Sequence, residues 1–340
     1  MDAFHPYADL FANPEGPGDA RPTAFQIIHD NDLVGKWSGK VVLITGGTSG
    51  MGLVSARALR LTGADVYITA RDLAKAEAVI AEITSSVEGG GKLEVIEMDL
   101  DSLESVKQAA KDFLAKSSTL NVLINNAGIM AIPEPIKTKD GFDQQFGVNH
   151  LAHFTLTALL LPTLVASSTP SFNSRVVSLT SSGHRYSPVD LADPNFASRP
   201  YNPWVAYGQS KTANLWMTNH LDRLYGSKGV HAVSCQPGIV VTPLHKHVDA
   251  ATGDAWQSDE KVRVGIKTPE QGAATPVWAA VAPVWEGTGG KYLFDVAVGG
   301  PARDPMSMAD HGYGAHAFDE ESERKLWELS LELTGVKIDV

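Results

Sequence analysis

The chain has 340 residues, of which 43% are hydrophobic, and a formal net charge of −11 at pH 7. This length suits one large α/β domain or two small ones. The negative charge argues against nucleic acid and anionic membrane surfaces as partners, because both would repel the protein.

Further function classes are disfavoured by missing features. The longest apolar run, around residues 156–165, is interrupted by polar residues and a proline. It is therefore shorter than the roughly 18 residues of a membrane span, and the N-terminus lacks a secretory signal. Cys235 is the single cysteine, which excludes an intramolecular disulfide and fits a reducing, cytoplasmic location. The histidine pairs at 150/153 and 245/247 lack further ligands at a metal-site spacing, so we expect no metal.

Residues 1–39 precede any repeating pattern, and we expect an N-terminal arm whose first 22 residues are loosely ordered. From residue 40 to 340, short apolar runs alternate with helical periodicity, which predicts one domain. Seven strands separated mostly by helices predict a doubly wound, Rossmann-type α/β fold with a parallel sheet and helices on both faces. We expect strands at 41–45, 65–70, 93–98, 122–125, 175–179, 231–236 and 292–294.

The same periodicity places the helices. Asp72 is a plausible N-cap for the second of them, and Pro162 should bend or end the longest. Residues 184–206 form a loop, and residues 243–267 are polar and look irregular. We expect helices at 51–62, 72–83, 102–116, 142–165, 205–225, 269–281 and 319–333.

A glycine-rich turn follows the first expected strand and opens the first expected helix. Glycine lets the backbone turn sharply and approach an anion, and the helix start offers unpaired N–H groups. This order indicates a cradle for the phosphates of a dinucleotide, although an ordinary βα turn has the same order. The candidate cofactor-binding residues here are Thr45, Gly46, Thr48, Ser49, Gly50, Met51 and Gly52.

Arg71 follows the second expected strand, in the region where an NAD-binding protein carries an acidic residue for the ribose 2′-hydroxyl. A guanidinium group can instead neutralise a 2′-phosphate through two hydrogen bonds, which favours NADP(H) over NAD(H). The alternative is a solvated surface arginine.

Polar residues also follow the third and fourth expected strands. Asp99, with Leu100 beside it, can accept a hydrogen bond from an adenine amino group, or it can cap the next helix. Asn126, Ala127 and Gly128 can brace the cofactor and the neighbouring strand, or they can form a simple turn.

Tyr207 and Lys211 are four residues apart on the helix expected at 205–225, so their side chains share one face. A phenol with a pKa of about 10 is a poor acid or base near neutrality, but a nearby ammonium group and a cationic nicotinamide would lower that pKa. Tyr207 can then exchange a proton with an alcohol or carbonyl oxygen while a cofactor exchanges hydride. The alternative for such a pair is an ordinary surface contact.

Taken together, these residues resemble the short-chain dehydrogenase/reductase family over about residues 40–300. The gap of 26 positions from Ser181 to Tyr207 resembles the retinol-dehydrogenase-like and WW-domain-oxidoreductase-like branch, and the arm and tail look similar to soluble fungal members. The matching motifs, in chain order, are TGGTSGMG at 45–52, NNAG at 125–128, Asn149, Ser181, Tyr207 with Lys211, and Pro237-Gly238 followed by Thr242.

The resemblance implies a role for each matching residue. Tyr207 would be the general acid/base, and Lys211 would lower its pKa and hold the nicotinamide ribose. Ser181 would polarise the substrate oxygen, with Ser182 as the open alternative, and Asn149 would anchor a water that links Lys211 to solvent. The residues expected near the nicotinamide are Pro237, Gly238, Val240 and Thr242.

The expected function is therefore an NADP(H)-dependent oxidoreductase that interconverts an alcohol and a ketone or aldehyde. Five aromatic residues in 184–206 and 243–267 favour a lipophilic small-molecule substrate, unless they only pack the loops. Two alternatives are a secondary-metabolism reductase acting on a C=C bond or an aromatic tautomer, and a non-catalytic NADP-binding regulatory protein. The family also implies a homodimer through the helices at 142–165 and 205–225. The five aromatics are Tyr186, Phe196, Tyr201, Trp204 and Trp256.

Overall fold

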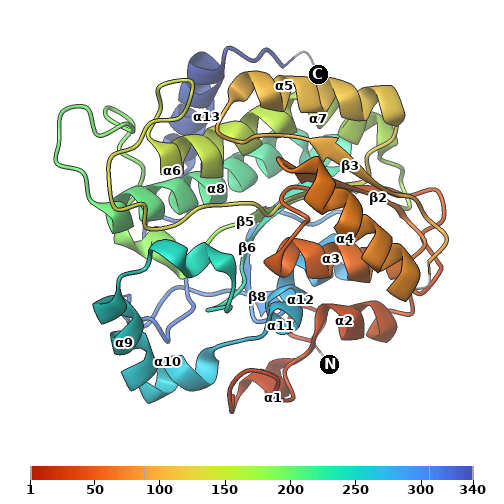
Figure 1. Ribbon diagram of the computed structural model, residues 1–340, viewed down its shortest axis with the longest axis horizontal. Helices are drawn as coiled ribbons and strands as arrows, with labels where there is room; N and C mark the ends of the chain where they lie inside the picture. Colours follow the sequence, from red (N-terminus) through yellow and green to blue (C-terminus); the bar gives the residue numbers. More distant parts are fainter. Residues whose placement is uncertain (1, 88, 306, 339–340) are drawn as a thin grey trace.

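The sheet is the frame of the computed structural model, which describes residues 2–87, 89–305 and 307–338 (Figure 1). The expected arm begins at Met1 and the expected domain ends at Val340, and both of these residues lie outside the described ranges. Within the described residues, eight strands follow the order β3-β2-β1-β4-β5-β6-β7-β8. All neighbours are parallel except β7 and β8. The strands are β1 Val41–Ile44, β2 Asp65–Ala70, β3 Leu93–Glu97, β4 Val122–Asn125, β5 Ser174–Leu179, β6 Val230–Gln236, β7 Lys291–Phe294 and β8 Ala297–Val298.

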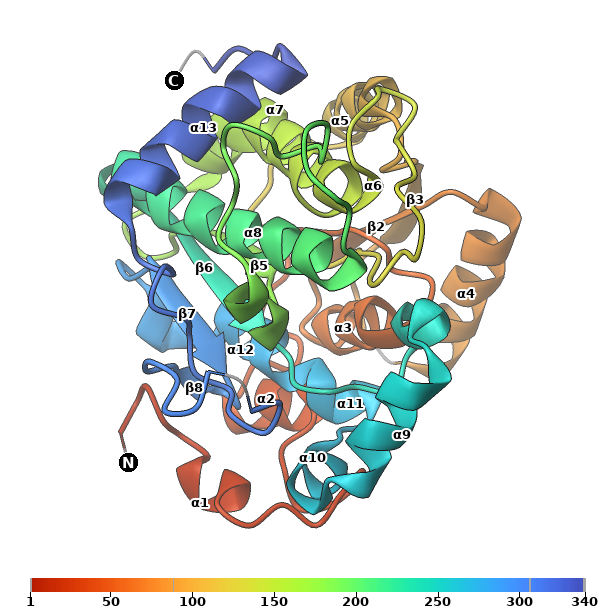
Figure 2. The same ribbon diagram turned by 90° about the vertical axis from the view of Figure 1, so that its left-hand side faces the viewer.

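Helices cover both faces of this sheet, as Figure 2 shows. Side chains of β1 alternate between two buried apolar clusters, because successive residues of a strand point to opposite faces. One cluster contains residues of α2, α3 and α12, and the other contains residues of α5, α7 and α8. The helices are α1 Ala8–Phe11, α2 Ala24–Asp30, α3 Gly50–Leu61, α4 Leu73–Ser86, α5 Leu103–Lys116, α6 Gln144–Phe146, α7 Ala152–Ser167, α8 Pro203–Tyr225, α9 Ala250–Ser258, α10 Glu260–Gly265, α11 Pro269–Gly272, α12 Ala274–Val281 and α13 Glu320–Thr334.

The expected α/β fold with a mostly parallel sheet is confirmed, with an additional edge strand. β8 returns antiparallel to β7 through Asp295 and Val296, whose φ angles are 51° and 54°. Glycine or asparagine normally occupies such left-handed positions. The sequence therefore offered no hairpin signal here, and the expectation of seven strands missed β8.

The long middle helix differs from its expectation in two ways. A π-helical turn, Gly147–Leu151, separates α6 from α7. Pro162 lies inside α7, which continues to Ser167, so the expectation that this proline could end the helix was wrong. Residues 144–167 are apolar enough to span a membrane by length and composition, but 67% of their most apolar window is buried inside the protein. This helix packs in the core against α5 and β5.

The N-terminal arm is packed against the fold, which corrects the expectation of loose order in its first 22 residues. Arg21 is 3% exposed and forms hydrogen bonds to distant backbone. Ile27 and Ile28 of α2 are fully buried against α3 and α12, and Trp37 packs edge to face on Phe172. Paired polar groups and a few apolar anchors therefore order a segment whose composition is typical of a flexible one.

Residues 243–267 also contain more regular structure than we expected. They form a 3-10 turn followed by α9 and α10, whose N-caps are Asp249 and Asp259. Each capping carboxylate accepts a hydrogen bond from a backbone N–H of the first turn. In short polar helices with little apolar periodicity, such N-cap residues are the main feature by which the sequence can predict the helix.

The C-terminal helix α13 packs on α8 and on the π-helical turn before α7 (Figure 2). Trp327 of α13 packs edge to face on Phe154 of α7, with ring centroids 5.0 Å apart. Asn219 of α8 donates a hydrogen bond of 2.8 Å to Glu323. The C-terminal helix thus covers part of α8 and the start of α7.

Three buried histidines make stability depend on pH. Burial lowers the pKa of His150 to about 3 and the pKa values of His153 and His184 to about 4. The folded protein keeps them neutral, whereas the unfolded chain binds protons below about pH 6.5. Their stabilising effect is fully present above that pH and is lost as the pH falls toward 4, by about 1.4 kcal/mol per pH unit for each histidine. Urea unfolding at pH 7, 6 and 5 should show this decline, and a constant unfolding free energy would contradict it.

Candidate active site

A cavity of about 460 Å³ opens at the carboxyl ends of the central strands, where strand order reverses between β1 and β4. Ligands bind open α/β sheets at such a switch point. A smaller hollow of about 90 Å³ adjoins it and shares Met51, Asn126, Gly128 and Thr242 with it. The predicted residues that line the larger cavity are Gly46, Thr48, Ser49, Gly50, Met51, Arg71, Asp99, Leu100, Asn126, Ala127, Gly128 and Thr242.

The glycine turn has no room for side chains at three positions. A Cβ on Gly47 would lie 2.4 Å from Ile68, and one on Gly52 would lie 2.3 Å from the carbonyl oxygen of Gly46. Gly46 has a φ of 71°, which also favours glycine. Gly52 does not line the cavity, although we expected it to bind a ligand directly. Its missing side chain instead lets α3 approach the turn closely.

The first turn of α3 offers free donors to the cavity. No side chain caps this helix, although Ser49 occupies the N-cap position. Ser49, Gly50 and Met51 all line the cavity. The backbone N–H groups at a helix start have no partner within the helix and carry a partial positive charge. The arrangement can therefore hold a phosphate group.

Thr45 is fully buried and ties the ends of β1 and β4 together instead of facing the cavity. Its hydroxyl accepts hydrogen bonds from the backbone N–H groups of Asn126 and Ala127, at 2.9 and 3.0 Å. It also lies 2.9 Å from Nε2 of His153. His153 Nδ1 is 2.9 Å from the carbonyl oxygen of Asn149, which can only accept, so Nδ1 carries the proton. Nε2 of the neutral ring then accepts from the Thr45 hydroxyl.

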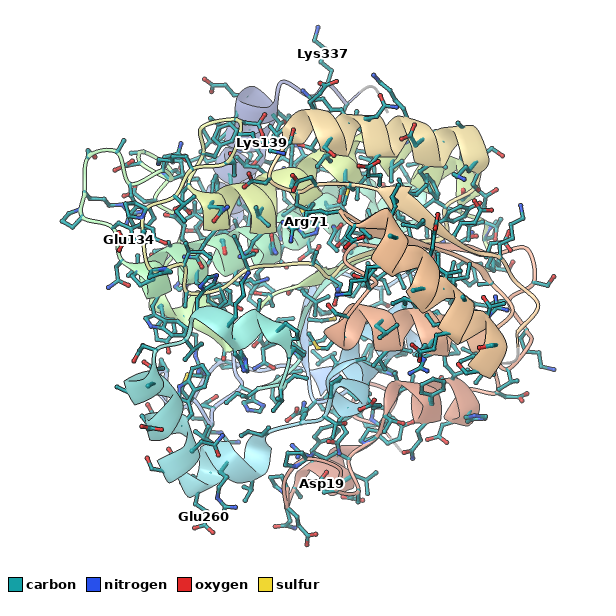
Figure 3. All side chains as sticks on the ribbon, viewed as in Figure 1. Asp19, Arg71, Glu134, Lys139, Glu260 and Lys337 are labelled. Atoms are coloured by element: carbon teal, nitrogen blue, oxygen red, sulfur yellow. The ribbon has the colours of Figure 1, made fainter. Side chains whose placement is uncertain are left out.

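Arg71, which is labelled in Figure 3, is exposed at the β2 and β3 end of the cavity. Asp99 lines the same cavity. Burial raises the pKa of the Asp99 carboxyl, but hydrogen bonds from Lys139 and from the N–H of Asp101, with the charge of Arg71, outweigh this and lower the pKa. Ser102 caps α5, so the alternative that Asp99 serves as the helix cap was wrong.

The predicted triad of Ser181, Tyr207 and Lys211 is brought together beside the smaller hollow, which all three residues line. The Ser181 side chain lies close enough to the Tyr207 phenol to act toward lowering its pKa. The Lys211 ammonium group lies 5.7 Å from the centre of the Tyr207 ring and donates to the carbonyl oxygen of Leu179 at 3.1 Å. Ser182, the open alternative to Ser181, is buried at the start of the following 3-10 turn.

Close backbone packing sets this geometry. A Cβ on Gly208 would lie 2.6 Å from the carbonyl oxygen of Gly183, and a Cβ on Gly183 would lie 2.9 Å from the Tyr207 ring. The turn after β5 can therefore press against α8 only because both positions are glycine. This contact places Ser181, which lies in the same turn, next to the Tyr207 phenol.

The protonation of the pair differs from our expectation. Burial raises the pKa of Tyr207 to about 12, and the nearby Ser181 side chain only partly offsets it. Burial likewise lowers the pKa of Lys211 to about 8. The protein alone thus keeps the phenol protonated at neutral pH, whereas we expected Lys211 to lower its pKa.

Asn149 lies in the π-helical turn and contacts the segment after β4, and it lines neither hollow. Its Oδ1 accepts from the N–H of Ile129 at 2.8 Å, and its Nδ2 donates to the Ile129 carbonyl and to Ser210, both at 2.9 Å. π-helical turns often occur at functional sites because the extra residue redirects side chains. Here the turn presents Asn149 to the chain segment beside Gly128.

The opposite wall of the smaller hollow is formed by Pro237, Gly238 and Val240, together with Thr242, as predicted. Gly238 has a φ of 94°, and a Cβ there would lie 3.0 Å from the buried Lys267 ammonium group. Lys267 was not predicted as part of the site. An isolated lysine gives no sequence signal for such a role.

Aromatic and thioether side chains close the outer end of the smaller hollow. Trp204 lies 6.4 Å from Tyr207 and 6.1 Å from both Tyr186 and Trp256, measured between ring centres. Phe196 and Tyr201, which we expected beside them, pack on each other instead. The lining residues that the sequence did not reveal include Met130, Leu179, Ile239, Leu244, His245 and Met308.

Comparisons with known proteins agree with this geometry. The family model described as short chain dehydrogenase matches residues 40–253. A short-chain dehydrogenase/reductase of Penicillium roqueforti is 48% identical over 97% of this chain and 95% of its own. The human polyprenol dehydrogenase is 38% identical over 87% of this chain and 86% of its own. A crystal structure of an uncharacterized protein from Mycobacterium paratuberculosis is 34% identical, with a TM-score of 0.67 over 89% of this chain and 96% of that one.

His153 should stabilise the junction of β1 and β4. Replacing it with leucine leaves the buried Thr45 hydroxyl without its acceptor and the Asn149 carbonyl without this donor. The His153→Leu variant should lose about 1–3 kcal/mol of unfolding free energy. Urea denaturation at pH 7 measures this loss, with His247→Leu as an exposed control. Equal stability of His153→Leu and wild type would refute the bridging role.

Proposed function

The chain belongs to the short-chain dehydrogenase family, and we propose that it is an NADP(H)-dependent oxidoreductase that interconverts an alcohol and a ketone or aldehyde on a lipophilic small molecule. One observation carries the proposal. The glycine cradle and the set of Ser181, Tyr207 and Lys211 line two adjoining hollows that share residues. A phosphate site and an acid–base group therefore lie within reach of one elongated ligand.

The residues along the cavity fit a nicotinamide dinucleotide. The N–H groups from Ser49 to Met51 would hold the pyrophosphate, and Arg71 would hold the 2′-phosphate of the adenosine ribose. Lys211 would hold the nicotinamide ribose, and Thr242 the carboxamide. When bound, this cofactor supplies or accepts a hydride at carbon.

Tyr207 would move the proton. Because burial keeps its phenol protonated at neutral pH, Tyr207 can donate to a carbonyl oxygen that is being reduced. Ser181 would donate a hydrogen bond to the same oxygen, and its contact with the phenol favours it over Ser182. In the oxidative direction, positive charge beside the phenol, from Lys211 among others, would have to stabilise the phenolate.

The aromatic wall supports a lipophilic substrate. Trp204, Trp256 and Met130 present apolar surface to the hollow beside Tyr207. Such surface favours ligands that leave water on binding. The name of the human relative, polyprenol dehydrogenase, is in keeping with a lipophilic alcohol.

We also propose that the protein acts as a monomer in the cytoplasm. A homodimer through α7 and α8, which family resemblance led us to expect, would have to displace α13 from both helices. Trp327 and Asn219 take part in that contact. The single buried Cys235 is in keeping with a reducing compartment.

Removing the Tyr207 hydroxyl should abolish turnover without loss of the cofactor. The Tyr207→Phe variant should lower kcat by roughly 10²- to 10⁴-fold, because general acid catalysis contributes that much. An NADPH-consumption screen over ketones, aldehydes and quinones would identify a substrate, and NADPH fluorescence would measure binding. Tyr225→Phe, on the same helix, is the matched control. Retained turnover in Tyr207→Phe would remove this residue from the mechanism.

Arg71 should determine the choice of cofactor. Arg71→Ala removes a charged partner of the 2′-phosphate, so the Kd for NADPH should rise about tenfold to a hundredfold. The Kd for NADH should stay the same, because NADH lacks that phosphate. Lys75→Ala, an exposed cation on the next helix, is the control. Equal affinity of the wild-type protein for both cofactors would contradict the NADP(H) assignment.

A further inference from the structure

We propose that the N-terminal arm is a working part of the substrate site, and that Arg21 is the positioning residue that holds α9 and α10 beside the cavity. Figures 1 and 2 both show α10 next to the arm. This inference extends the proposed function. It rests on that function only for the statement that the hollow binds the substrate. It gives the arm a role that its composition did not suggest.

The segment of α9 and α10 contributes to the hollow but has little core of its own. Trp256 of α9 lines the hollow. No residue of α9 is fully buried, and Val262 is the single buried residue of α10. Segments with few buried apolar contacts open locally at low free-energy cost. A stable position over the hollow therefore requires an anchor elsewhere.

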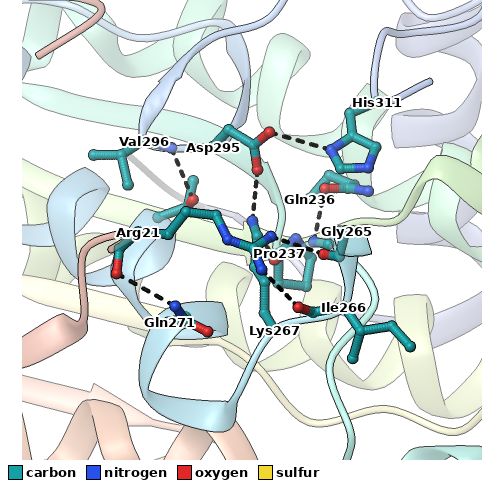
Figure 4. Close-up of polar contacts among 12 residues, drawn as sticks. Arg21, Gln236, Pro237, Gly265, Ile266, Lys267, Gln271, Asp295, Val296 and His311 are labelled. Atoms are coloured by element: carbon teal, nitrogen blue, oxygen red, sulfur yellow. Dashed lines mark hydrogen bonds and ion pairs between the residues drawn. The ribbon is translucent and has the colours of Figure 1, made fainter. Parts of the chain in front are cut away.

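Arg21 supplies that anchor at the end of α10 (Figure 4). Its guanidinium group donates to the carbonyl oxygens of Val264, Gly265 and Ile266, at 3.2, 2.9 and 2.7 Å. The last carbonyls of a helix have no partner within it, and the partial negative charge at this end of the helix attracts a cation. Asp19 accepts from Arg21 Nε at 2.8 Å, which orients the guanidinium group and balances its charge.

A second contact fixes the arm to the segment that follows α10. The side-chain oxygen of Gln271 accepts from the N–H of Gly18 at 3.0 Å and from the N–H of Thr268 at 3.1 Å. Its amide nitrogen donates to the Asp19 carboxylate at 2.9 Å. Asp19 thus connects Gln271 to Arg21, and the arm forms hydrogen bonds with residues on both sides of Lys267.

Lys267 carries the connection to the wall of the hollow. Its backbone N–H donates to the carbonyl oxygen of Ile239 at 2.9 Å, and its ammonium group donates to the carbonyl oxygen of Pro237 at 3.1 Å. The same ammonium group pairs with Asp295, which His311 approaches at 3.3 Å (Figure 4). Pro237 and Ile239 line the hollow beside the triad. The path from the arm to the site is therefore Arg21, Ile266, Lys267 and Pro237, each in contact with the next.

Lysine cannot replace Arg21 in this role. The planar guanidinium group has five donors in a fixed fork, whereas an ammonium group is a compact point charge on a flexible stem. Four backbone carbonyls, those of Gly16, Val264, Gly265 and Ile266, and one carboxylate accept hydrogen bonds from Arg21. The Arg21→Lys variant thus keeps the charge but loses most of the geometry.

Hydrogen exchange of the whole chain tests the proposal. In Arg21→Met, amides of residues 250–266 should exchange about tenfold faster than in wild type, because the anchor of a marginally stable segment is lost. Amides of β1, β4 and β5 should keep their wild-type rates. Arg57→Met, at a surface ion pair with Glu82, is the matched control. Wild-type exchange of residues 250–266 in folded Arg21→Met would overturn the proposal.

The activity of the same variants separates a positioning role from general destabilisation. Once a substrate is identified, Arg21→Met should raise its KM by about fivefold or more, with a smaller change in kcat and in the Kd for NADPH. Should Arg21→Met fail to fold, Arg21→Lys takes its place, and wild-type exchange in that variant would also overturn the proposal. The exchange measurement needs neither substrate nor cofactor. A wild-type protein without reductase activity would therefore refute the proposed function. The role of Arg21 would then still be decided by the hydrogen-exchange rates of residues 250–266.

Discussion

The hydrogen-bonded bridge between Thr45, His153 and Asn149 is the constraint on which the site depends. A parallel sheet must open a crevice where its strand order reverses, because the helices after β1 and β4 leave on opposite faces. The paired part of β1 and β4 ends at Ile44 and Ile124, and Thr45 follows directly. The Thr45 hydroxyl connects the two chain segments beyond that point by accepting from two N–H groups after β4 and donating to His153.

The bridge connects the larger cavity, where we propose that the cofactor binds, to the smaller hollow beside Tyr207. His153 contacts the carbonyl of Asn149, whose side chain holds the chain after β4 and reaches Ser210 of α8. Ser210 directly precedes Lys211, so the glycine turn and the helix that carries Tyr207 share one buried network. Such networks stabilise a unique geometry only when every member is paired. The low pKa of His153, which burial causes, keeps the ring in the neutral form that this pairing requires.

Local chemistry made much of this site predictable from the sequence. The glycine turn, Arg71 and the pair Tyr207/Lys211 lie where strand ends and helix spacing placed them. His153 was considered only as a metal ligand, although its spacing of four residues from Asn149 already puts both on one helical face. The burial that raises the pKa of Tyr207 could not be read from the chain, because it depends on how the turn after β5 packs against the Tyr207 ring on α8. The same holds for Arg21, whose partners at the end of α10 lie more than 240 residues away.

A crystal structure of the protein with bound NADPH tests the central claim most directly. We predict the pyrophosphate on the N–H groups of residues 49–51, the 2′-phosphate against Arg71, and the nicotinamide ring beside Tyr207 and Lys211. A dinucleotide bound away from the glycine turn, or a nicotinamide ring that does not reach Tyr207, would contradict the account.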